Sequence, residues 1–157
     1  MNKDLKYNHI FDYSPITDNI YIGSDLCQGG VCKIHGEEFK KLKVTAEINL
    51  KLEDNELPPK EIKAYTWLPV SDQAAPSSMQ FDIGSVVINE TVKAGEVIYI
   101  HCKDGHGRAP TIVAAYLIRF QKMTAGEAID FIKSKRPEIH VEDIQVKALE
   151  EFMAKYH

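Results

Sequence analysis

The sequence predicts an α/β fold in which a central, mostly parallel sheet is flanked by helices. Short apolar runs rich in β-branched residues alternate with longer segments that begin at helix-capping residues, as an α/β domain requires. With 157 residues, of which 44% are hydrophobic and 27% charged, the chain can bury one sizeable core and is too short for two. We therefore expect residues 1–157 to form a single domain.

The first half of the chain supplies three of the expected strands. Residues 19–24 are expected to form an opening strand and turn, and residues 44–50 and 62–70 are apolar runs of strand length. Residues 36–43, between the first two strands, are expected to form a short helix. Residues 51–59 are charged and contain two adjacent prolines, so we expect a loop exposed to solvent.

The second half begins with a helix and contains one further strand. Ser77 and Gln80 have the spacing of a capping box, and Gly95 ends the helix that they start. Thr124 and Glu127 have the same spacing. The remaining elements follow from apolar runs and stop signals: a helix over residues 77–93, a strand over 96–100, and helices over 111–120, 124–136 and 141–156.

Apolar side chains near the C-terminus are expected to complete the core. They are Ile139, Val141, Ile144, Leu149 and Phe152. Gln145 is assigned to packing or to solvent, because a lone helical glutamine carries little mechanism by itself. Tyr65 and Trp67 are assigned to the core rather than to the lining of a substrate pocket.

The most informative segment lies between the 96–100 strand and the helix after it, and reads His101-Cys102-Lys103-Asp104-Gly105-His106-Gly107-Arg108-Ala109-Pro110. Gly105 and Gly107 can take positive φ and carry no Cβ, so consecutive backbone N–H groups can turn inward onto an anion. Arg108 offers a planar fork to two phosphate oxygens. A helix N-terminus with adjacent cations lowers the pKa of a cysteine thiol below its free value of about 8.5, which makes it a nucleophile. The segment therefore predicts a phosphate-binding loop with Cys102 at its base.

This segment resembles the His-Cys-x5-Arg signature loop of the protein tyrosine phosphatases, and the short chain is similar to their dual-specificity branch. Residues 19–24 likewise resemble the opening strand of that branch. The glycine spacing and the Gly-Lys-Ser/Thr ending of a Walker-type nucleotide loop are absent. The resemblance implies a dual-specificity phosphatase-like fold. It also implies a cysteine-dependent phosphatase acting on phosphotyrosine and phosphoserine/threonine proteins through a cysteinyl-phosphate intermediate.

The resemblance also implies a role for each residue of the site. Cys102 attacks phosphorus, and Arg108 with the loop N–H groups holds the equatorial oxygens. Asp72, in the loop after the 62–70 strand, protonates the leaving oxygen and then activates the water that hydrolyses the intermediate. His101 orders the loop and tunes the thiolate by hydrogen bonding. The residues expected around the phosphate are Lys103, Asp104, Gly105, His106, Gly107 and Arg108.

Two assignments stay open. Asp72 has the position of an ordinary turn or helix-capping aspartate, and Asp104 competes with it as the acid. Because an inward carboxylate would oppose a phosphate dianion, we expect Asp104 to point outward. Ala109 departs from the family pattern, which usually has Ser or Thr there to assist the thiolate as a leaving group in the second step. Thr111 is the nearest alternative hydroxyl.

The substrate is the least determined feature. The ending Gly-x-Gly-Arg-Ala-Pro also resembles that of glucan phosphatases, and Lys103 and His106 could contact further phosphates, as in phosphoinositide phosphatases. A non-catalytic phospho-binding module is a third alternative, and the presence of Cys102, Arg108 and Asp72 argues against it. Phosphorylated proteins remain the default expectation.

Composition excludes several partners and points to a compartment. A net charge of −4 argues against a nucleic-acid or anionic-membrane surface, and no apolar run approaches membrane-spanning length. With no secretory signal, we expect a cytoplasmic protein that needs no cofactor. Cys27, Cys32 and His35 could suggest zinc but lack a clear fourth ligand, so no metal is expected and two reduced structural thiols are favoured. Whether either thiol pairs with Cys102 on oxidation stays open.

Overall fold

The computed structural model describes residues 11–26 and 32–157. Within these ranges the chain forms a five-stranded sheet in the order β1-β2-β5-β3-β4. The strands are β1 (Tyr13–Pro15), β2 (Ile20–Gly23), β3 (Val44–Lys51), β4 (Ala64–Val70) and β5 (Val97–His101). β1 pairs with β2 in the antiparallel sense and all other neighbours are parallel, so the predicted, mostly parallel α/β sheet is confirmed.

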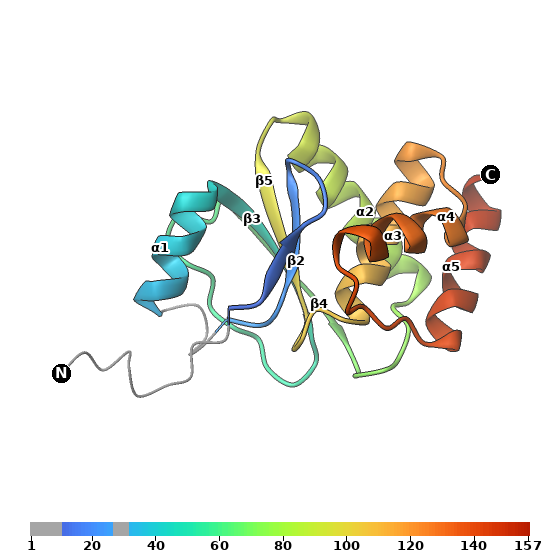
Figure 1. Ribbon diagram of the computed structural model, residues 1–157, viewed down its shortest axis with the longest axis horizontal. Helices are drawn as coiled ribbons and strands as arrows, with labels where there is room; N and C mark the ends of the chain where they lie inside the picture. The colour runs from blue at the N-terminus through green and yellow to red at the C-terminus, as the bar shows by residue number, and fades with distance from the viewer. Residues whose placement is uncertain (1–10, 27–31) are drawn as a thin grey trace.

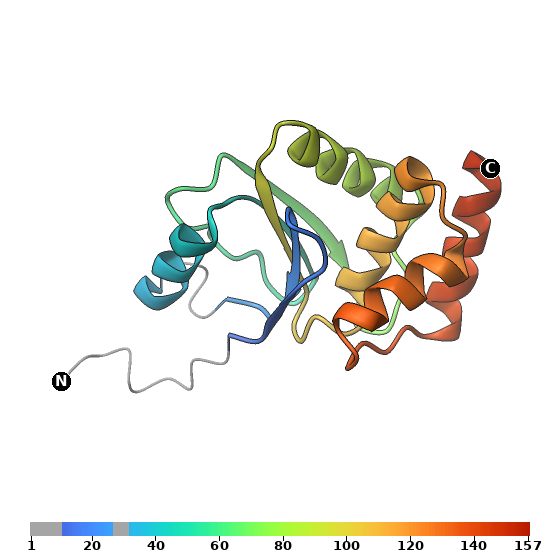
Figure 2. The ribbon, with the colours of Figure 1, turned by 45° about the horizontal axis from the view of Figure 1, so that its top comes forward.

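Helices cover both faces of this sheet (Figures 1 and 2). One face is covered by the four helices α2 (Ser78–Lys93), α3 (Arg108–Gln121), α4 (Ala125–Lys135) and α5 (Asp143–Tyr156), and the other by α1 (Lys33–Leu42). α3 contacts α2, α4 and α5 and is buried along most of its length. None of the helices in the described ranges is long and apolar enough to cross a membrane.

The two faces of the sheet differ in chemistry. Successive residues of a strand point to opposite faces, and Ile48 and Ile100 belong to the apolar core that includes residues of α2 to α5. Tyr99 belongs instead to a second cluster with residues of α1. Glu47 and His101, one residue away from those two isoleucines, are also 0% exposed. One face is therefore an ordinary apolar core, and the other contains buried charged side chains.

Residues 52–59 form the predicted loop, and residues 52–55 and 57 are exposed, but two charged side chains of the 51–59 run are buried. Lys51 ends β3 with its side chain only 5% exposed, and its ammonium donates to Asp25 (2.8 Å), Asp54 (3.0 Å) and Glu56 (2.9 Å). Glu56 is buried as well. The local charge pattern could not reveal this burial, because one carboxylate partner, Asp25, lies far away in the sequence and only the fold supplies it.

The assignment of two residues to the core was wrong. Trp67 is 39% exposed on the edge strand β4, where its Nε1 donates to the carbonyl of Lys51 at 2.7 Å. Ile144 is 60% exposed on α5. Tyr65 is half-buried, and its hydroxyl donates to the side chain of Asn55 at 2.6 Å. An edge strand is paired on one side only, so its side chains are less completely covered.

The predicted boundaries are accurate where a capping residue marks them. The capping box of Ser77 and Gln80 is confirmed at the start of α2. The antiparallel strand β1 was not predicted, since it is short and contains Pro15. Three helix starts also differ from the prediction: α1, α3 and α5 begin at Lys33, Arg108 and Asp143 rather than at residues 36, 111 and 141.

Candidate active site

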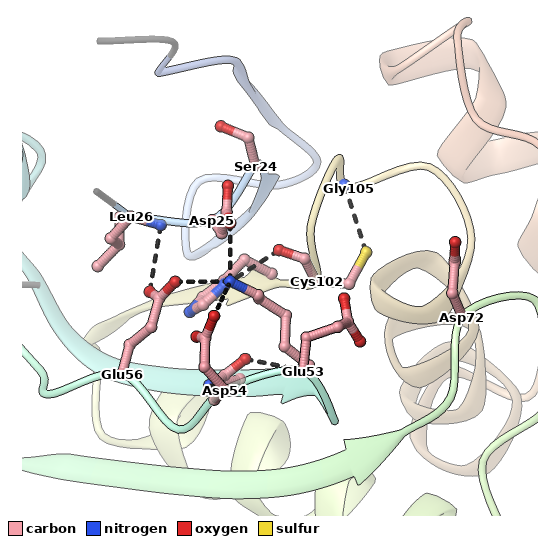
Figure 3. A network of polar contacts seen from close by, with 12 residues as sticks. Ser24, Asp25, Leu26, Glu53, Asp54, Glu56, Asp72, Cys102 and Gly105 are labelled. Carbon is pink, nitrogen blue, oxygen red and sulfur yellow. Dashed lines mark hydrogen bonds and ion pairs between the residues drawn. The ribbon is translucent and has the colours of Figure 1, made fainter. Parts of the chain in front are cut away.

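The loop between β5 and α3 holds Cys102 at the C-terminal end of the central strand (Figure 3). Cys102 is 3% exposed, and its Sγ accepts a hydrogen bond from the N–H of Gly105 at 3.3 Å. Gly105 has a φ of 74°, and a Cβ there would lie 2.5 Å from the carbonyl oxygen of Gly23. Only glycine fits this position, so the loop can close over the thiol only with Gly105 in place.

Four successive carbonyl groups of this loop accept hydrogen bonds from surrounding elements. The donors to the carbonyl oxygens of Lys103, Asp104, Gly105 and His106 are, in order, Asp25 N–H (2.9 Å), Arg136 Nη2 (3.0 Å), Arg136 Nε (2.9 Å) and His140 N–H (2.7 Å). A trans peptide places its N–H opposite its carbonyl, so the N–H groups that follow face the other side of the loop. On that side, the Gly105 N–H meets Cys102 Sγ. A row of N–H groups turned to one side is a binding site for an anion.

Arg136 holds the outer side of the loop from the end of α4. Its side chain is 0% exposed, and besides the two loop carbonyls it donates to the Asp12 carboxylate at 3.0 Å and to Ser14 Oγ at 3.0 Å. A buried guanidinium requires such partners because burial removes its hydration. Arg136 therefore ties the β1 segment to the phosphate loop, a role that the sequence analysis missed because no local spacing signals it.

Arg108 is the first residue of α3 and is 2% exposed. The carboxylate of Glu53 accepts from its Nη1 at 2.6 Å and its Nη2 at 3.1 Å, and the carbonyl of Val70 accepts from Nη1 at 2.8 Å. Its Nε is buried and has no hydrogen-bond partner in residues 11–26 and 32–157. Leaving a buried donor unsatisfied costs roughly 1–3 kcal/mol, so this N–H is available to an oxyanion.

The pairing with Glu53 fixes the charges of both groups. Burial opposes the charge of Arg108, but the hydrogen bonds to Glu53 and the nearby charge of Cys102 outweigh it and hold the pKa of Arg108 above its usual value. The same hydrogen bonds lower the pKa of Glu53 to about 2. Glu53 lies within a charged run and was not among the predicted site residues. Its position after the carboxyl end of β3 was the usable signal, because the ends of parallel strands converge at one edge.

Asp72 follows β4 and reaches the same edge of the sheet. Its Oδ1 lies 3.7 Å from Nη2 of Arg108, and its side chain is 76% exposed. In Figure 3 it lies on the other side of the Cys102 thiol from Asp25 and Glu56, which pair with Lys51. The competing Asp104 is exposed on the loop itself. The structure therefore brings Asp72 beside the arginine of the loop.

Gln145 connects the Asp72 loop to the C-terminal helix. It is 0% exposed, its Nε2 donates to the carbonyl of Ala74 at 2.9 Å, and its Oε1 accepts from the N–H of Glu142 at 2.9 Å. A Cβ at Gly107 would lie 3.5 Å from the same Nε2. Gln145 is thus buried, as one of its two predicted assignments required, and it is hydrogen-bonded to the Asp72 loop and lies close to Gly107.

His101 ends β5 directly before Cys102 and is 0% exposed. Its Nε2 lies 2.8 Å from Oε1 of Glu47, and its Nδ1 lies 3.3 Å from the carbonyl oxygen of Cys102. Burial works against a charge on this ring, but the hydrogen bond to Glu47 and the charges of Glu47 and Glu56 raise the pKa of His101 above its ordinary value. Glu47, the only carboxylate on the buried strand β3, was not among the predicted site residues.

The position directly after Arg108, where the family usually has Ser or Thr, is fully buried. Ala109 is 0% exposed in the first turn of α3. Thr111, the nearest alternative hydroxyl, is also buried, and its Oγ1 donates to the carbonyl of Arg108 at 2.7 Å. The proton of Thr111 is therefore directed at the helix backbone.

The remaining predicted residues are spread around this centre. On the loop, Lys103 is exposed and His106 half-buried. Cys32 is 5% exposed at the N-cap of α1, and His35 in that helix is 0% exposed. Cys27, the third residue of the zinc alternative, lies outside the described residues.

Comparisons with known proteins assign the chain to a family. The family model "Dual specificity phosphatase, catalytic domain" matches residues 26–155. The phosphatidylglycerophosphate phosphatase PTPMT2 of Arabidopsis thaliana is 34% identical over 120 residues, covering 73% of this chain and 53% of that protein. The tyrosine-protein phosphatase vhp-1 of Caenorhabditis elegans is 29% identical over 126 residues, covering 79% of this chain and 18% of that protein. The chain thus spans about half, or less, of the length of these relatives.

Solved structures show the same fold. PTPMT1 in complex with PI(5)P matches with a TM-score of 0.81 at 22% identity, covering 92% of this chain and 96% of that chain. Human DUSP28 matches with a TM-score of 0.78 at 20% identity, covering 90% and 96%. At these identities the likeness concerns the fold, and the family follows from the model that matches most of the chain. The resemblance drawn from the sequence is confirmed, and the chain belongs to the dual-specificity phosphatase catalytic domain family of phosphoric monoester hydrolases.

Proposed function

We propose that residues 1–157 form a single catalytic domain that hydrolyses phosphomonoesters on tyrosine and on serine or threonine of proteins, through a cysteinyl-phosphate intermediate. The observation that carries this proposal is the hydrogen bonding of four successive loop carbonyls to outside donors, which turns the intervening N–H groups toward the side of Cys102. The buried, unpartnered Nε of Arg108 adds a charged donor. Together these donors fit the equatorial oxygens of a phosphoryl group.

In the first step the Cys102 thiolate attacks phosphorus, and the bond from phosphorus to the substrate oxygen breaks. The loop N–H groups and Arg108 stabilise the charge on the three equatorial oxygens as the phosphoryl group passes between the two atoms. Asp72 gives its proton to the leaving oxygen, so an alcohol or phenol departs. Glu53 stays ionised opposite Arg108 and keeps the fork in place.

In the second step a water molecule attacks phosphorus of the cysteinyl-phosphate. Asp72, now a carboxylate, takes a proton from that water, and the bond between sulfur and phosphorus breaks. Inorganic phosphate leaves and the Cys102 thiolate is restored. Because this cycle needs a reduced thiol, we place the enzyme in the cytoplasm, where thiols are kept reduced.

A panel of substrates tests this proposal. Phosphotyrosine and phosphoserine peptides should both be hydrolysed, turnover should resist EDTA, and vanadate or thiol alkylation should stop it. A phosphoglucan in the same panel tests the carbohydrate alternative. Binding of phosphopeptides without turnover of any substrate would contradict catalysis and favour a phospho-binding module.

A second candidate is a phosphorylated lipid. Two exposed apolar residues, Leu52 (52%) and Ile144 (60%), directly precede the site residues Glu53 and Gln145 in the chain. Proteins named phosphatidylglycerophosphate phosphatases are among the relatives. Phosphatidylglycerophosphate and phosphoinositides in micelles should be compared with soluble glycerol phosphate. Faster hydrolysis of the lipid than of any peptide, reversed by Leu52→Ser with Ile144→Ser, would decide for the lipid.

A further inference from the structure

A cluster of buried charges lies in contact with the phosphate loop through the residue that precedes Cys102. We call Glu47, Lys51, Glu56 and His101 the buried charge cluster. Glu47 and His101 are 0% exposed and their side chains are joined at 2.8 Å, while Lys51 donates to Glu56 at 2.9 Å. Figure 3 shows Glu56 of this cluster on the same side of Cys102 as Asp25 and Asp54. Of these four residues, the family resemblance implied a role for His101 alone.

We propose that Glu47 is a positioning residue that holds His101 as a doubly protonated imidazolium beneath the phosphate loop, where this charge favours the thiolate of Cys102. The inference rests on the proposed function only in taking Cys102 as the nucleophile. It concerns a carboxylate that no sequence motif of the loop contains.

Both ring nitrogens of His101 face acceptors. Nδ1 lies 3.3 Å from the carbonyl oxygen of Cys102, and Nε2 lies 2.8 Å from a carboxylate oxygen of Glu47. A carbonyl oxygen and an ionised carboxylate can only accept, so each nitrogen must carry a proton. A histidine with two N–H groups is the imidazolium. The other oxygen of Glu47 has no hydrogen-bond partner within the described part of the chain, which leaves His101 as the group that satisfies this carboxylate.

The charges of the cluster balance only in this state. With His101 charged, two cations face the two carboxylates of Glu47 and Glu56, whereas a neutral ring would leave one buried carboxylate uncompensated. Glu56 also accepts from the N–H of Leu26 at 3.2 Å. Lys51 cannot restore the balance alone, because it also donates to partly exposed carboxylates of the adjoining loops.

Among the described residues, the charged groups that act most strongly on the His101 ring are the carboxylates of Glu47 and Glu56. Asp25 from the segment after β2 and Asp54 from the loop after β3 bring further negative charge to Lys51. From β5 itself, the Tyr99 ring packs 5.6 Å from the His101 ring, and its hydroxyl donates to the carbonyl of Ser24 at 2.6 Å. Carboxylates raise the affinity of the ring for its second proton, and the raised pKa of His101 agrees with this.

Two other arrangements fit the geometry less well. Ligand atoms of Glu47, Glu56 and His101 lie within 4.8 Å of one another, as in a metal site, but the Lys51 ammonium already occupies Oε1 of Glu56. Alternatively, Glu47 could be a neutral carboxylic acid that donates to a neutral ring. Burial opposes a charge on the ring, but the hydrogen bond to Glu47 and the charges of Glu47 and Glu56 outweigh it and raise the pKa of His101, which places the shared proton on the ring.

Nitrogen-15 NMR of the folded protein, labelled at histidine, tests the charge state directly. An ordinary histidine has a pKa of about 6.5 and is largely neutral at about pH 8. We expect both ring nitrogens of His101, assigned by comparison with His101→Gln, to remain protonated at that pH. A neutral His101 ring in the wild type would overturn the proposal, and this measurement requires no variant of Glu47 and no turnover.

Glu47→Gln tests the consequence for the thiol. Glutamine has the same shape and can donate its amide to Nε2, so His101 can become neutral without losing its hydrogen bond. The alkylation rate of Cys102 by iodoacetamide, followed by mass spectrometry of its peptide across pH, should shift its midpoint upward by about one pH unit. Glu90→Gln, at a position 62% exposed, is the matched control and should leave the midpoint unchanged.

The outcomes separate this proposal from the proposed function. An unchanged alkylation midpoint in Glu47→Gln, with activity lowered equally at every pH, would mean that Glu47 serves folding only and would overturn the inference. If the variant does not fold, the wild-type NMR result still decides. A shifted midpoint in a protein that hydrolyses no phosphomonoester would contradict the proposed function and support the role of Glu47.

Discussion

The two groups that act in the proposed reaction are held in opposite ways. Cys102 is 3% exposed, between a central strand and a buried helix, and its loop is fixed by hydrogen bonds to four successive carbonyls. The side chain of Asp72 is 76% exposed on a loop, with Arg108 at 3.7 Å. The phosphoryl group is the same in every substrate, whereas the leaving group varies. A rigid pocket for the phosphoryl group and an exposed acid for the leaving group therefore suit a broad range of phosphomonoesters.

This difference between Cys102 and Asp72 also predicts which substitutions should lower the activity most. Donors that are fixed before the substrate arrives stabilise the transition state without reorganising, and they are usually the largest single contribution. A positioned acid typically contributes 10²- to 10⁴-fold. Changes at the thiol should therefore cost more than changes at Asp72, and changes at supporting residues should cost less than either.

The largest effect is expected from Cys102→Ser. A serine hydroxyl at this buried position is a far weaker nucleophile than a thiolate, so turnover should be abolished. The loop N–H groups and Arg108 remain, so binding of vanadate or tungstate, measured by calorimetry, should persist. Turnover by the serine variant, or loss of wild-type activity on addition of EDTA, would exclude the cysteinyl-phosphate route.

The second-largest loss of activity is expected at Asp72, the exposed residue of the two. Asp72→Asn should slow aryl phosphates with poor leaving groups by roughly 10²- to 10³-fold and activated ones less, because only poor leaving groups require the proton. The measurement is kcat/KM across a series of phenols of increasing pKa.

Asp104→Asn is the matched control for Asp72→Asn. This aspartate is exposed on the loop itself, so its variant should show the smaller effect. A larger loss at Asp104 for the poor leaving groups would reverse the assignment of the acid.

A smaller effect should follow from restoring the missing hydroxyl. Without it the cysteinyl-phosphate should break down slowly, so wild-type enzyme should show a burst of phenol release in rapid-quench experiments. One hydrogen bond to a charged group is worth roughly 1.5–3 kcal/mol, so Ala109→Ser should speed breakdown by about ten- to a hundredfold. We expect a higher kcat and a smaller burst.

The position of Thr111 sharpens this expectation. Its hydroxyl donates to the carbonyl of Arg108, so it does not replace the missing group. Thr111→Val is the control and should leave the breakdown rate of the intermediate unchanged. Absence of a burst in the wild type, together with an unchanged kcat in Ala109→Ser, would show that Ala109 has no influence on the second step.

The sequence predicted the phosphate loop better than the distant residues that hold this loop in place. Cys102, Gly105 and Arg108 lie within one short segment, and the strand, loop and helix around them follow from apolar runs and glycines. Glu53 and Arg136 reach the same loop from distant positions, and only the fold brings them there. Spacing along the chain cannot show contacts of that kind.

The charged run at residues 51–59 shows the physical limit most clearly. Charged residues beside prolines normally form a solvated loop. The local sequence pattern is the same whether or not a residue distant in the sequence pairs with one of these charges in the folded protein. Here Lys51 and Glu56 are buried and pair with each other, and Asp25, distant in the sequence, supplies a further carboxylate to Lys51. The capping box of Ser77, by contrast, was predictable because both of its partners are neighbours in sequence.

The smallest effect is expected at Glu53, where the two halves of the site meet. The pKa of Glu53 is lowered to about 2 by its hydrogen bonds to Arg108, so the folded state favours its charged form. A carboxylate with a depressed folded pKa contributes stability that is fully present above its unfolded pKa of about 4.3 and is lost as pH falls toward 2. Glu53→Gln should therefore lower the urea midpoint at pH 7, and its difference from wild type should shrink across that acidic window.

Because the side chain of Glu53 is 41% exposed, solvent weakens the pair, and the loss of stability should be small. The activity of Glu53→Gln should fall only a few-fold, since glutamine can still accept one hydrogen bond from Arg108 and only the charge-assisted part is lost. Glu90→Gln, which breaks an exposed pair with Lys93, is the matched control and should change neither quantity. A stability difference that stays constant from pH 7 to about pH 2.5 would mean that Glu53 acts through shape rather than charge. In that case Cys102 and the rest of the phosphate loop, and not Glu53, would keep Arg108 charged.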